Sequence, residues 1–415
     1  LTGDPKYKQA AVDATRYAFH HLRHPSGLIY WGGHATWDLV TDQPVGEGRT
    51  DGQAGKHEFK RNYPFYELMW EIDPHVTRTF IESFWSNHVL DWSNLDFNRH
   101  GAYRPVSTVL WGHTYHGGPI PFIGRGLTFI HTGSDLYYAA AMLSRFTGDE
   151  QPMTWANRLA RRYHDACHPR TGLGGDNFSE EKTRRFVQQF GPEFGERLTE
   201  ASFTAIYGSR YRHAAVCQLK LAQRLGPDGD DFARWAVADM IAYAKHAYDP
   251  DDNAFWATLI DGTRLTPADR KRPGYVSTRW LEKRKPDGHN FWAYVLAFNH
   301  TRDPLLWDMV RRLARGFQLG DFDHKPDAPD QGDLQTPAAD PLLVFALLDL
   351  HAGIKNHAFL DLARRVGDNL LASQFHRGFF VPSKDHLFCK LDTVTPLALL
   401  YLDAALADAP VELPL

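Results

Sequence analysis

Apolar and small residues recur at helical spacing through most of the chain, with charged residues between them. Stop and start signals separate these stretches: His24-Pro25-Ser26-Gly27 follows the first, and Asp73-Pro74 precedes the third. The pattern therefore predicts a mainly helical protein. The predicted helices cover residues 6–22, 63–70, 74–85, 127–146, 153–167, 181–190, 208–225, 229–248, 289–300, 304–318, 338–352, 357–373 and 394–407.

Strand signals are short and local. They fall at residues 255–260, 378–381 and 387–389, and residues 28–45 add a short extended segment and loop. Helix pairs recur at intervals of roughly 40–60 residues, as stacked helical hairpins do. No shift of composition marks a domain boundary. We therefore predict one all-α domain over residues 1–415, an incomplete (α/α) toroid of about six or seven helical hairpins with a few short β-hairpins.

The composition limits the partners. A formal net charge of −4 over 415 residues gives no electrostatic basis for binding nucleic acid or an anionic membrane surface. The chain has no apolar run of about 18 residues, so no membrane-spanning helix is predicted. Aromatic residues make up 13% of the chain, and many adjoin polar residues, which favours a carbohydrate-binding cleft.

Cysteine usage and the start of the chain bear on the compartment. Three widely spaced cysteines without a CxxC pair predict neither a disulfide framework nor a zinc–thiolate site. The chain starts with Leu1 and not with Met. We expect a periplasmic or secreted protein if a leader has been removed, and a cytoplasmic one otherwise. The sequence leaves the oligomeric state open.

Three separated fragments carry residues of metal-ligand type, His34, Glu58 and His100. Tens of residues separate them, so only the tertiary fold could assemble them into one site. Two imidazoles and one carboxylate suit Mn, Ni, Co or Zn, and suit Ca or Mg less well. Three protein ligands would leave coordination positions open for water or for a substrate oxygen.

The segments around these residues resemble the family-2 polysaccharide lyases, which are pectate lyases. The similar segments are Tyr30–Ala35, His57–Lys60 with Tyr63–Tyr66, Arg99-His100, Gly133–Ala140 and His168–Gly174. The resemblance is good over about residues 28–180 and looser elsewhere, and it extends to neighbouring α/α-toroid uronate lyases. It implies that His34, Glu58 and His100 hold a divalent metal (Mn, Ca, Ni, Co or Zn) and that Arg99 is the Brønsted base.

The implied chemistry is β-elimination on a uronate polymer. The enzyme removes the proton at C5, α to the carboxylate, and the C4 oxygen leaves. A cation must neutralise the carboxylate before the C5 proton becomes acidic, and a metal ion or an arginine can do this. Arginine normally stays protonated, so two roles for Arg99 stay open, base or carboxylate clamp.

Other polar residues are candidates for the cleft. The loop His113-Thr114-Tyr115-His116 offers a His/Tyr acid–base pair, and its flanking glycines let a ligand approach the backbone. The catalytic candidates are thus Arg99, His113, Tyr115 and His116. The candidates for substrate binding are Trp31, Lys56, Lys60, Tyr207, Arg210 and His213.

The sequence therefore predicts a polysaccharide lyase that acts by metal-assisted β-elimination on an acidic, uronate-rich polymer or oligosaccharide. Polygalacturonate is the favoured substrate. A glucuronan or alginate lyase that uses a His/Tyr pair is the nearest alternative. An α/α-toroid glycoside hydrolase with two carboxylates and a non-catalytic glycan-binding protein also stay open. For the hydrolase, the carboxylates would come from Asp165, Asp176, Glu180, Glu181 or Asp392.

Overall fold

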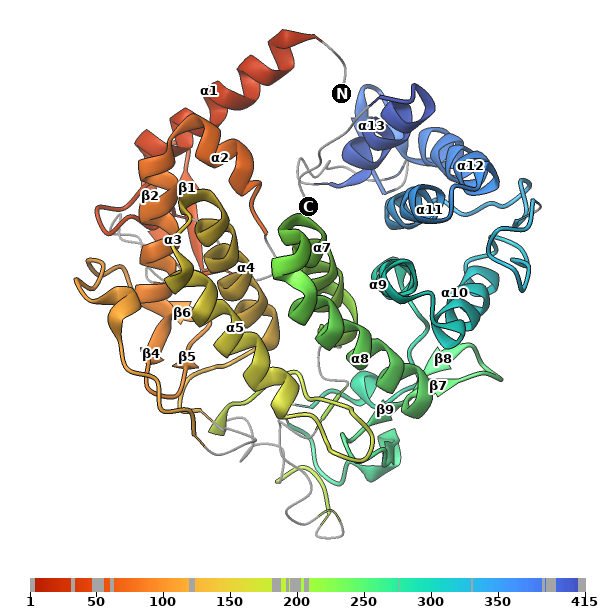
Figure 1. The fold of residues 1–415 in the computed structure, drawn as a ribbon, viewed down its shortest axis with the longest axis horizontal. Helices are drawn as coiled ribbons and strands as arrows, with labels where there is room; N and C mark the ends of the chain where they lie inside the picture. The colour runs from red at the N-terminus through yellow and green to blue at the C-terminus, as the bar shows by residue number, and fades with distance from the viewer. Residues whose placement is uncertain are drawn as a thin grey trace. The chain divides into compact units, whose positions relative to one another are not determined.

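The computed structural model describes most of the chain (Figure 1). The chain divides into two compact units. The N-terminal unit comprises mainly Asp4–Trp235 with Ala257–Glu282, and the C-terminal unit comprises mainly Ala236–Trp256 with Lys283–Pro414. A single domain over residues 1–415 stays a prediction. The described residues are 4–30, 34–46, 56–59, 63–118, 124–180, 188–191, 194, 203–204, 209–274, 276–329, 331–382, 385 and 393–409.

The helices of the N-terminal unit agree with the predicted pattern. They are α1 (Pro5–His21), α2 (Tyr66–Ile72), α3 (Pro74–His88), α4 (Ile130–Thr147), α5 (Glu150–Asp165) and α7 (Ala215–Leu225), and α8 (Asp230–His246) begins in this unit. The C-terminal unit contains α9 (Gly288–Thr301), α10 (Pro304–Gly316), α11 (Pro341–Ile354), α12 (His357–Gln374) and α13 (Thr395–Leu406). Most of the predicted helix at 181–190 lies outside the described residues.

Asp-Pro pairs fix where several helices begin. The Asp73 side chain accepts a hydrogen bond from the Val76 amide at 2.9 Å, and Pro74 occupies the first turn of α3. The same arrangement starts α1, α10 and α11. An aspartate satisfies an otherwise unpaired amide of the first turn, and proline there loses no helical hydrogen bond. These starts were readable in the sequence for this reason.

Consecutive helices form hairpins in which one helix is enclosed and the other is amphipathic. The side chains of α4 from Ile130 to Leu143 are all buried, whereas its partner α5 buries only one face, including Trp155 and Leu159. Helices α9 and α10 differ in the same way within the C-terminal unit. Enclosed inner helices paired with amphipathic outer helices are what a layered helical fold requires.

The described strands are short and pair antiparallel, each with one partner. The pairs are β1 (Ala35–Asp38) with β2 (Gln43–Gly46), β3 (His57–Glu58) with β6 (His100–Gly101), β4 (Val89–Asp91) with β5 (Asp96–Phe97), β7 (Tyr248–Asp249) with β8 (Ala254–Phe255), β9 (Ala257–Thr258) with β10 (Arg264–Leu265), and β11 (Phe375–His376) with β12 (Phe379–Phe380). Strand signals at 255–260 and 378–381 therefore match real hairpins, and the one at 387–389 lies outside the described residues. Across the helices that the structure describes, none is long and apolar enough to cross a membrane.

Candidate functional site

Strands β3 and β6 form the base of the candidate site. Their register pairs Glu58 with His100 and His57 with Gly101. Arg99 and His100 lie between the predicted helices 74–85 and 127–146, where no strand was predicted. The pairing of β6 with β3 is what brings Glu58 beside His100. His34 comes from a third segment, immediately before β1. All three proposed ligands belong to the N-terminal unit.

The three side chains converge as metal ligands do. Nε2 of His34 lies 3.4 Å from Oε2 of Glu58, and Nε2 of His100 lies 3.7 Å from Oε1 of the same carboxylate. One ligand atom from each residue lies within 4.8 Å of the other two. Two ligands about 2.1 Å from a tetrahedral ion lie about 3.4 Å apart. The separations and the donor set thus fit one divalent transition-metal ion.

The environment keeps the ligands in the right chemical form. Burial is the main effect that lowers the pKa of His100 to about 4, and the neighbouring Arg99 charge adds to it. The imidazole is therefore neutral at neutral pH, and the neutral ring is the form that binds a metal. Glu58 is only 1% exposed. A buried carboxylate is costly without a cationic partner, and the Arg99 guanidinium supplies one here. The other carboxylate oxygen, Oε2, faces His34.

Arg99 lies against the same carboxylate. Its Nε lies 3.3 Å from Oε1 of Glu58 and donates to Nε2 of His100 at 3.2 Å. The guanidinium carbon sits 4.9 Å from the ring centre of Phe129. The Nε2 atom of His100 has one lone pair, which can serve either Arg99 or a metal. Metal binding through this atom and the Arg99–His100 hydrogen bond therefore exclude each other.

A buried pair of histidines lies directly behind the two strands. His88 of α3 faces His57 of β3, with 2.8 Å between its Nε2 and Nδ1 of His57. Nδ1 of His88 lies 2.8 Å from the carbonyl oxygen of Asn98. A carbonyl oxygen can only accept a hydrogen bond, so His88 donates to it from Nδ1. Nε2 of His88 then accepts a hydrogen bond from Nδ1–H of His57. Burial lowers the pKa of both rings, that of His88 to about 4, which keeps them neutral.

This histidine pair connects both ligand-bearing strands to α3. His57 is adjacent to Glu58, and the Asn98 side chain accepts the backbone N–H of His100 at 2.9 Å. A Cβ atom at Gly101 would lie 2.5 Å from Nε2 of His88, so the close approach of β6 to His88 depends on glycine there. The pair thus lies in a position from which hydrogen-bonded groups commonly orient the ligands of a metal site.

His88→Phe is expected to weaken metal binding by about 10–100-fold, since it leaves His57 Nδ1–H and the Asn98 carbonyl unpaired behind the ligands. Titration of the metal-free protein with Mn or Zn measures the effect. Thr204→Val is the matched control, because it removes buried hydrogen bonds to Thr258 in the same unit. It should lower thermal stability without changing metal affinity. Equal metal affinity in both variants would contradict the positioning role of His88.

The candidate substrate-binding residues near the strands are only partly described. Lys56 is exposed just before β3, and its charge contributes to lowering the pKa of His100. It therefore lies near His100. Trp31 and Lys60, and likewise Tyr207, lie outside the described residues.

The loop 113–118 is held against α5 and β4–β5. His113 stacks on Trp92 with 4.8 Å between ring centres, and Tyr115 packs edge-on against Trp155 at 5.9 Å. The His116 amide donates to the carbonyl of Ser93 at 2.8 Å. His113, Tyr115 and His116 therefore lie beside α5 and the turn between β4 and β5. Arg99 and His100 lie at the start of β6 instead.

Arg210 has an interior position that does not suit substrate binding. It is 2% exposed, and its guanidinium donates to the Tyr163 carbonyl at 3.1 Å and to Sγ of Cys167 at 3.0 Å. We therefore revise the expectation for Arg210 to a structural role at the start of α7. His213 is half-buried in the irregular turn Arg210–Ala214 that precedes this helix.

The fold and the site together define the class of protein. The chain resembles the solved structure of cellobiose 2-epimerase from Bacillus thermoamylovorans B4167 with a TM-score of 0.51 and 11% identity, over 95% of this chain and 99% of that one. This likeness shows the fold alone, and it confirms the predicted α/α-toroid class. The chain is thus an α/α-toroid protein with two histidines, a glutamate and an arginine gathered at one strand pair.

The chain belongs to the periplasmic pectate lyase family, whose model matches residues 1–415. A pectate disaccharide-lyase of Dickeya dadantii (strain 3937) is 30% identical over 448 residues, which cover 100% of this chain and 78% of that protein. The predicted family and the enzyme class, a polysaccharide lyase that breaks a carbon–oxygen bond, are therefore confirmed.

Sequence reasoning missed the residues that support the site. His88 lies just beyond the predicted helix 74–85 and Phe129 lies within the predicted helix 127–146, and neither belongs to a recognisable motif. Gly101 was the available signal, because a glycine directly after Arg99-His100 suggests a close approach by another group. The arginines of α5 were also passed over, although their spacing places them on one side of the helix.

Proposed function

We propose that this enzyme cleaves polygalacturonate by β-elimination, with a divalent metal held by His34, Glu58 and His100. The observation that carries the proposal is the convergence of these ligands with Arg99, whose Nε lies 3.3 Å from the shared carboxylate. Membership of the pectate lyase family and the name of the Dickeya relative support pectate as the substrate.

Each group at the site has a use in this reaction. The C5–H bond breaks, its electron pair forms the C4–C5 double bond, and the C4–O bond breaks with its electrons on the leaving oxygen, which takes up a proton from water. A bound divalent ion would supply a positive charge that neutralises the uronate carboxylate and makes the C5 proton more acidic. Arg99 takes that proton, or it clamps the carboxylate while solvent water takes the proton. The exposed Lys56 binds an acidic group of the polymer.

The description of the family supports a periplasmic site of action. We propose this location for the enzyme, with an acidic polysaccharide or oligosaccharide as its partner. Fractionation of the native host, followed by immunodetection in the periplasmic and cytoplasmic fractions, tests it. A protein found in the cytoplasmic fraction alone would contradict this location.

The alternative of a glucuronan or alginate lyase depends on a His/Tyr pair. His113 and Tyr115 are the candidates, but they contact Trp92 and Trp155 respectively. The metal-ligand cluster combines a candidate cation site with Arg99, so it can supply both the charge neutralisation and the base or clamp that elimination requires. We therefore favour the strand-pair site and keep the other polymers as outcomes of the substrate test.

Incubation with polygalacturonate is expected to produce unsaturated uronate ends, seen as a rise in ultraviolet absorbance. Glucuronan and alginate are tested in parallel and should give little or no rise. Exhaustive chelation is expected to lower the rate at least about a hundredfold, because a cation supplies several kcal/mol of charge stabilisation. Addition of Mn, Co, Ni, Zn or Ca one at a time should restore it and rank the ions.

The outcomes separate the parts of the proposal. A rise with alginate or glucuronan alone would replace the substrate but keep the elimination. Full activity in chelator, with metal content measured as absent, would rule out a catalytic metal. New reducing ends without the absorbance change would contradict elimination itself.

A further inference from the structure

A second pocket lies on α5 and shares no lining residue with the strand pair that carries the candidate metal ligands. It has a volume of about 410 Å³ and is formed on one side by α5 and on the other by Tyr115, Gly117 and Gly118. This volume is in the usual range for small-ligand sites. We call it the α5 pocket, and its helix residues are Thr154, Asn157, Arg158, Arg161, Arg162 and Asp165.

The loop side of the α5 pocket is fixed by hydrogen bonds. Trp155 of α5 donates from its ring nitrogen to the Trp111 carbonyl at 3.0 Å. The His116 and Gly117 amides both donate to the Ser93 carbonyl, at 2.8 and 3.0 Å. Gly117 has a φ of +79°, and a Cβ there would meet nothing within 4 Å. The loop side of the pocket is therefore held in place, and at Gly117 no side chain covers the backbone.

Arginines dominate the helix side. The guanidinium of Arg158 stacks on Tyr115 at 5.0 Å and on Trp155 at 4.6 Å from the ring centres, which holds its planar group in place. Arg161 is exposed, and its distance of 3.8 Å from the Asp231 carboxylate makes a weak surface pair. Both guanidinium groups therefore remain available to an anion that enters the pocket.

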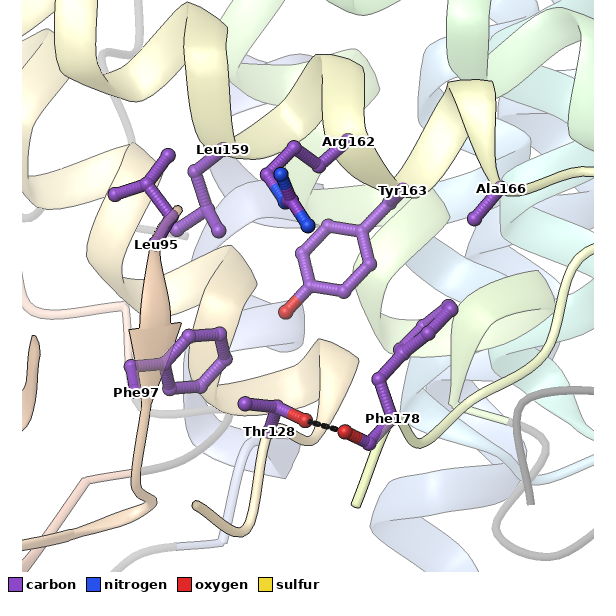
Figure 2. Close-up of a pocket in the computed structure, with 8 residues that line it drawn as sticks. All are labelled: Leu95, Phe97, Thr128, Leu159, Arg162, Tyr163, Ala166 and Phe178. Atoms are coloured by element: carbon purple, nitrogen blue, oxygen red, sulfur yellow. Dashed lines mark hydrogen bonds between the residues drawn. The ribbon is translucent and has the colours of Figure 1, made fainter. Parts of the chain in front are cut away.

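Arg162 is in a different situation. It also lines a small interior cavity of about 20 Å³ whose other residues are mainly apolar, among them Leu159 and Phe178. Figure 2 shows its guanidinium beside the ring of Tyr163 within this cavity. We therefore base the inference on Arg158 and Arg161 and treat Arg162 as an adjacent positive charge. Asp165 is the acidic residue of the pocket, so positive charge prevails.

We propose that the α5 pocket is a second binding site for the acidic polymer, in which Arg158 and Arg161 hold a uronate carboxylate. The planar guanidinium matches a carboxylate with two parallel hydrogen bonds. Tyr115 holds the Arg158 guanidinium in place, and the Asn157 amide and Thr154 hydroxyl suit the hydroxyl groups of a sugar ring. This combination favours a carboxylate-bearing sugar over a bare inorganic anion, because a sugar hydroxyl can donate to the buried Asn157 amide oxygen and a bare anion cannot.

This inference rests on the proposed function, because it takes its polymer from there. A polymer that carries a carboxylate on every sugar can occupy the strand-pair site and the α5 pocket with different segments or different chains. Binding at a second site raises the effective concentration of polymer at the enzyme. The site should therefore matter for long polymer and matter little for short oligomers.

The test compares Arg158→Gln/Arg161→Gln with Arg16→Gln/Arg78→Gln, which removes two arginine charges from α1 and α3. Each double substitution is made in the Arg99→Ala protein, which is then loaded with metal. The resulting proteins are run in native gels that contain polygalacturonate, fully methyl-esterified polygalacturonate or no polymer. The pocket pair should bind polygalacturonate at least about tenfold more weakly than the control pair, since it loses two charge-assisted contacts. Neither pair should be retarded by the esterified polymer.

The same substitution pairs are then made in the wild-type chain for kinetics. The pocket pair should raise KM for long polygalacturonate about tenfold and leave kcat and KM for trigalacturonate unchanged. Melting temperatures and circular dichroism confirm that both pairs fold. Inorganic sulfate at the concentration of the polymer carboxylates should not abolish the retardation; if it does, the pocket binds anions without regard to the sugar.

The results distinguish failure of this site from failure of the enzymatic proposal. Equal retardation and equal KM for the pocket and control pairs would overturn the second site, even if the wild type is an active lyase. A wild type without lyase activity whose pocket pair still loses retardation would overturn the proposed function and keep the site. Loss of turnover on trigalacturonate in the pocket pair would place Arg158 or Arg161 in the reaction itself and contradict a separate site.

Discussion

Glu58→Gln is expected to abolish tight metal binding and to lower kcat about a thousandfold or more. Glu58 presents both carboxylate oxygens to the site, 3.4 Å from His34 and 3.7 Å from His100. Glutamine keeps the shape but removes the negative charge that balances a divalent ion. Loss of several kcal/mol of charge stabilisation corresponds to this change in rate. Metal content after dialysis and the ultraviolet assay measure the two effects.

The control for this variant is Glu71→Gln on α2. Glu71 is exposed and pairs with Lys8 at 2.7 Å, so the same chemical change on the surface should leave metal content and kcat unchanged. Circular dichroism checks that the Glu58 variant folds, because Arg99 loses its carboxylate partner there. Wild-type metal content and kcat in the Glu58→Gln protein would contradict the proposed set of metal ligands.

Arg99→Ala is expected to lower kcat about a thousandfold while the bound metal is retained. A positioned base commonly contributes about 10²–10⁴ in rate, and a clamp on the substrate carboxylate contributes a similar amount through charge stabilisation. The Arg99 side chain touches His100 and Glu58 through Nε but is not a metal ligand itself. Metal content therefore separates its loss from the loss of Glu58.

Chemical rescue then distinguishes the two roles of Arg99. Added amines of increasing basicity should restore the Arg99→Ala rate in proportion to their basicity if Arg99 takes the C5 proton. Added guanidinium alone should restore it, without dependence on amine basicity, if Arg99 clamps the carboxylate. Arg78→Ala, an exposed arginine paired with Glu82 on α3, is the control. A kcat for Arg99→Ala equal to that of the control would exclude both roles.

The sequence by itself determined the helical framework. Caps such as Asp73-Pro74 and the apolar spacing of helices such as α4 act within one or two turns, so they can be read from a short stretch of chain. The observed helices begin and end close to the predicted ones for this reason. The sequence also presented His34, Glu58, Arg99 and His100 as candidates, because their side-chain chemistry and the family resemblance are local properties.

Only the tertiary structure decided how those candidates meet. Glu58 and His100 face each other because β3 pairs with β6, and two-residue strands give almost no signal in the sequence. The same holds for His88, which reaches His57 from α3, and for Arg158, which lies over Tyr115 from another segment. These contacts depend on strand register and helix packing across long chain separations. Local patterns do not encode them, and the folded chain fixes them through burial.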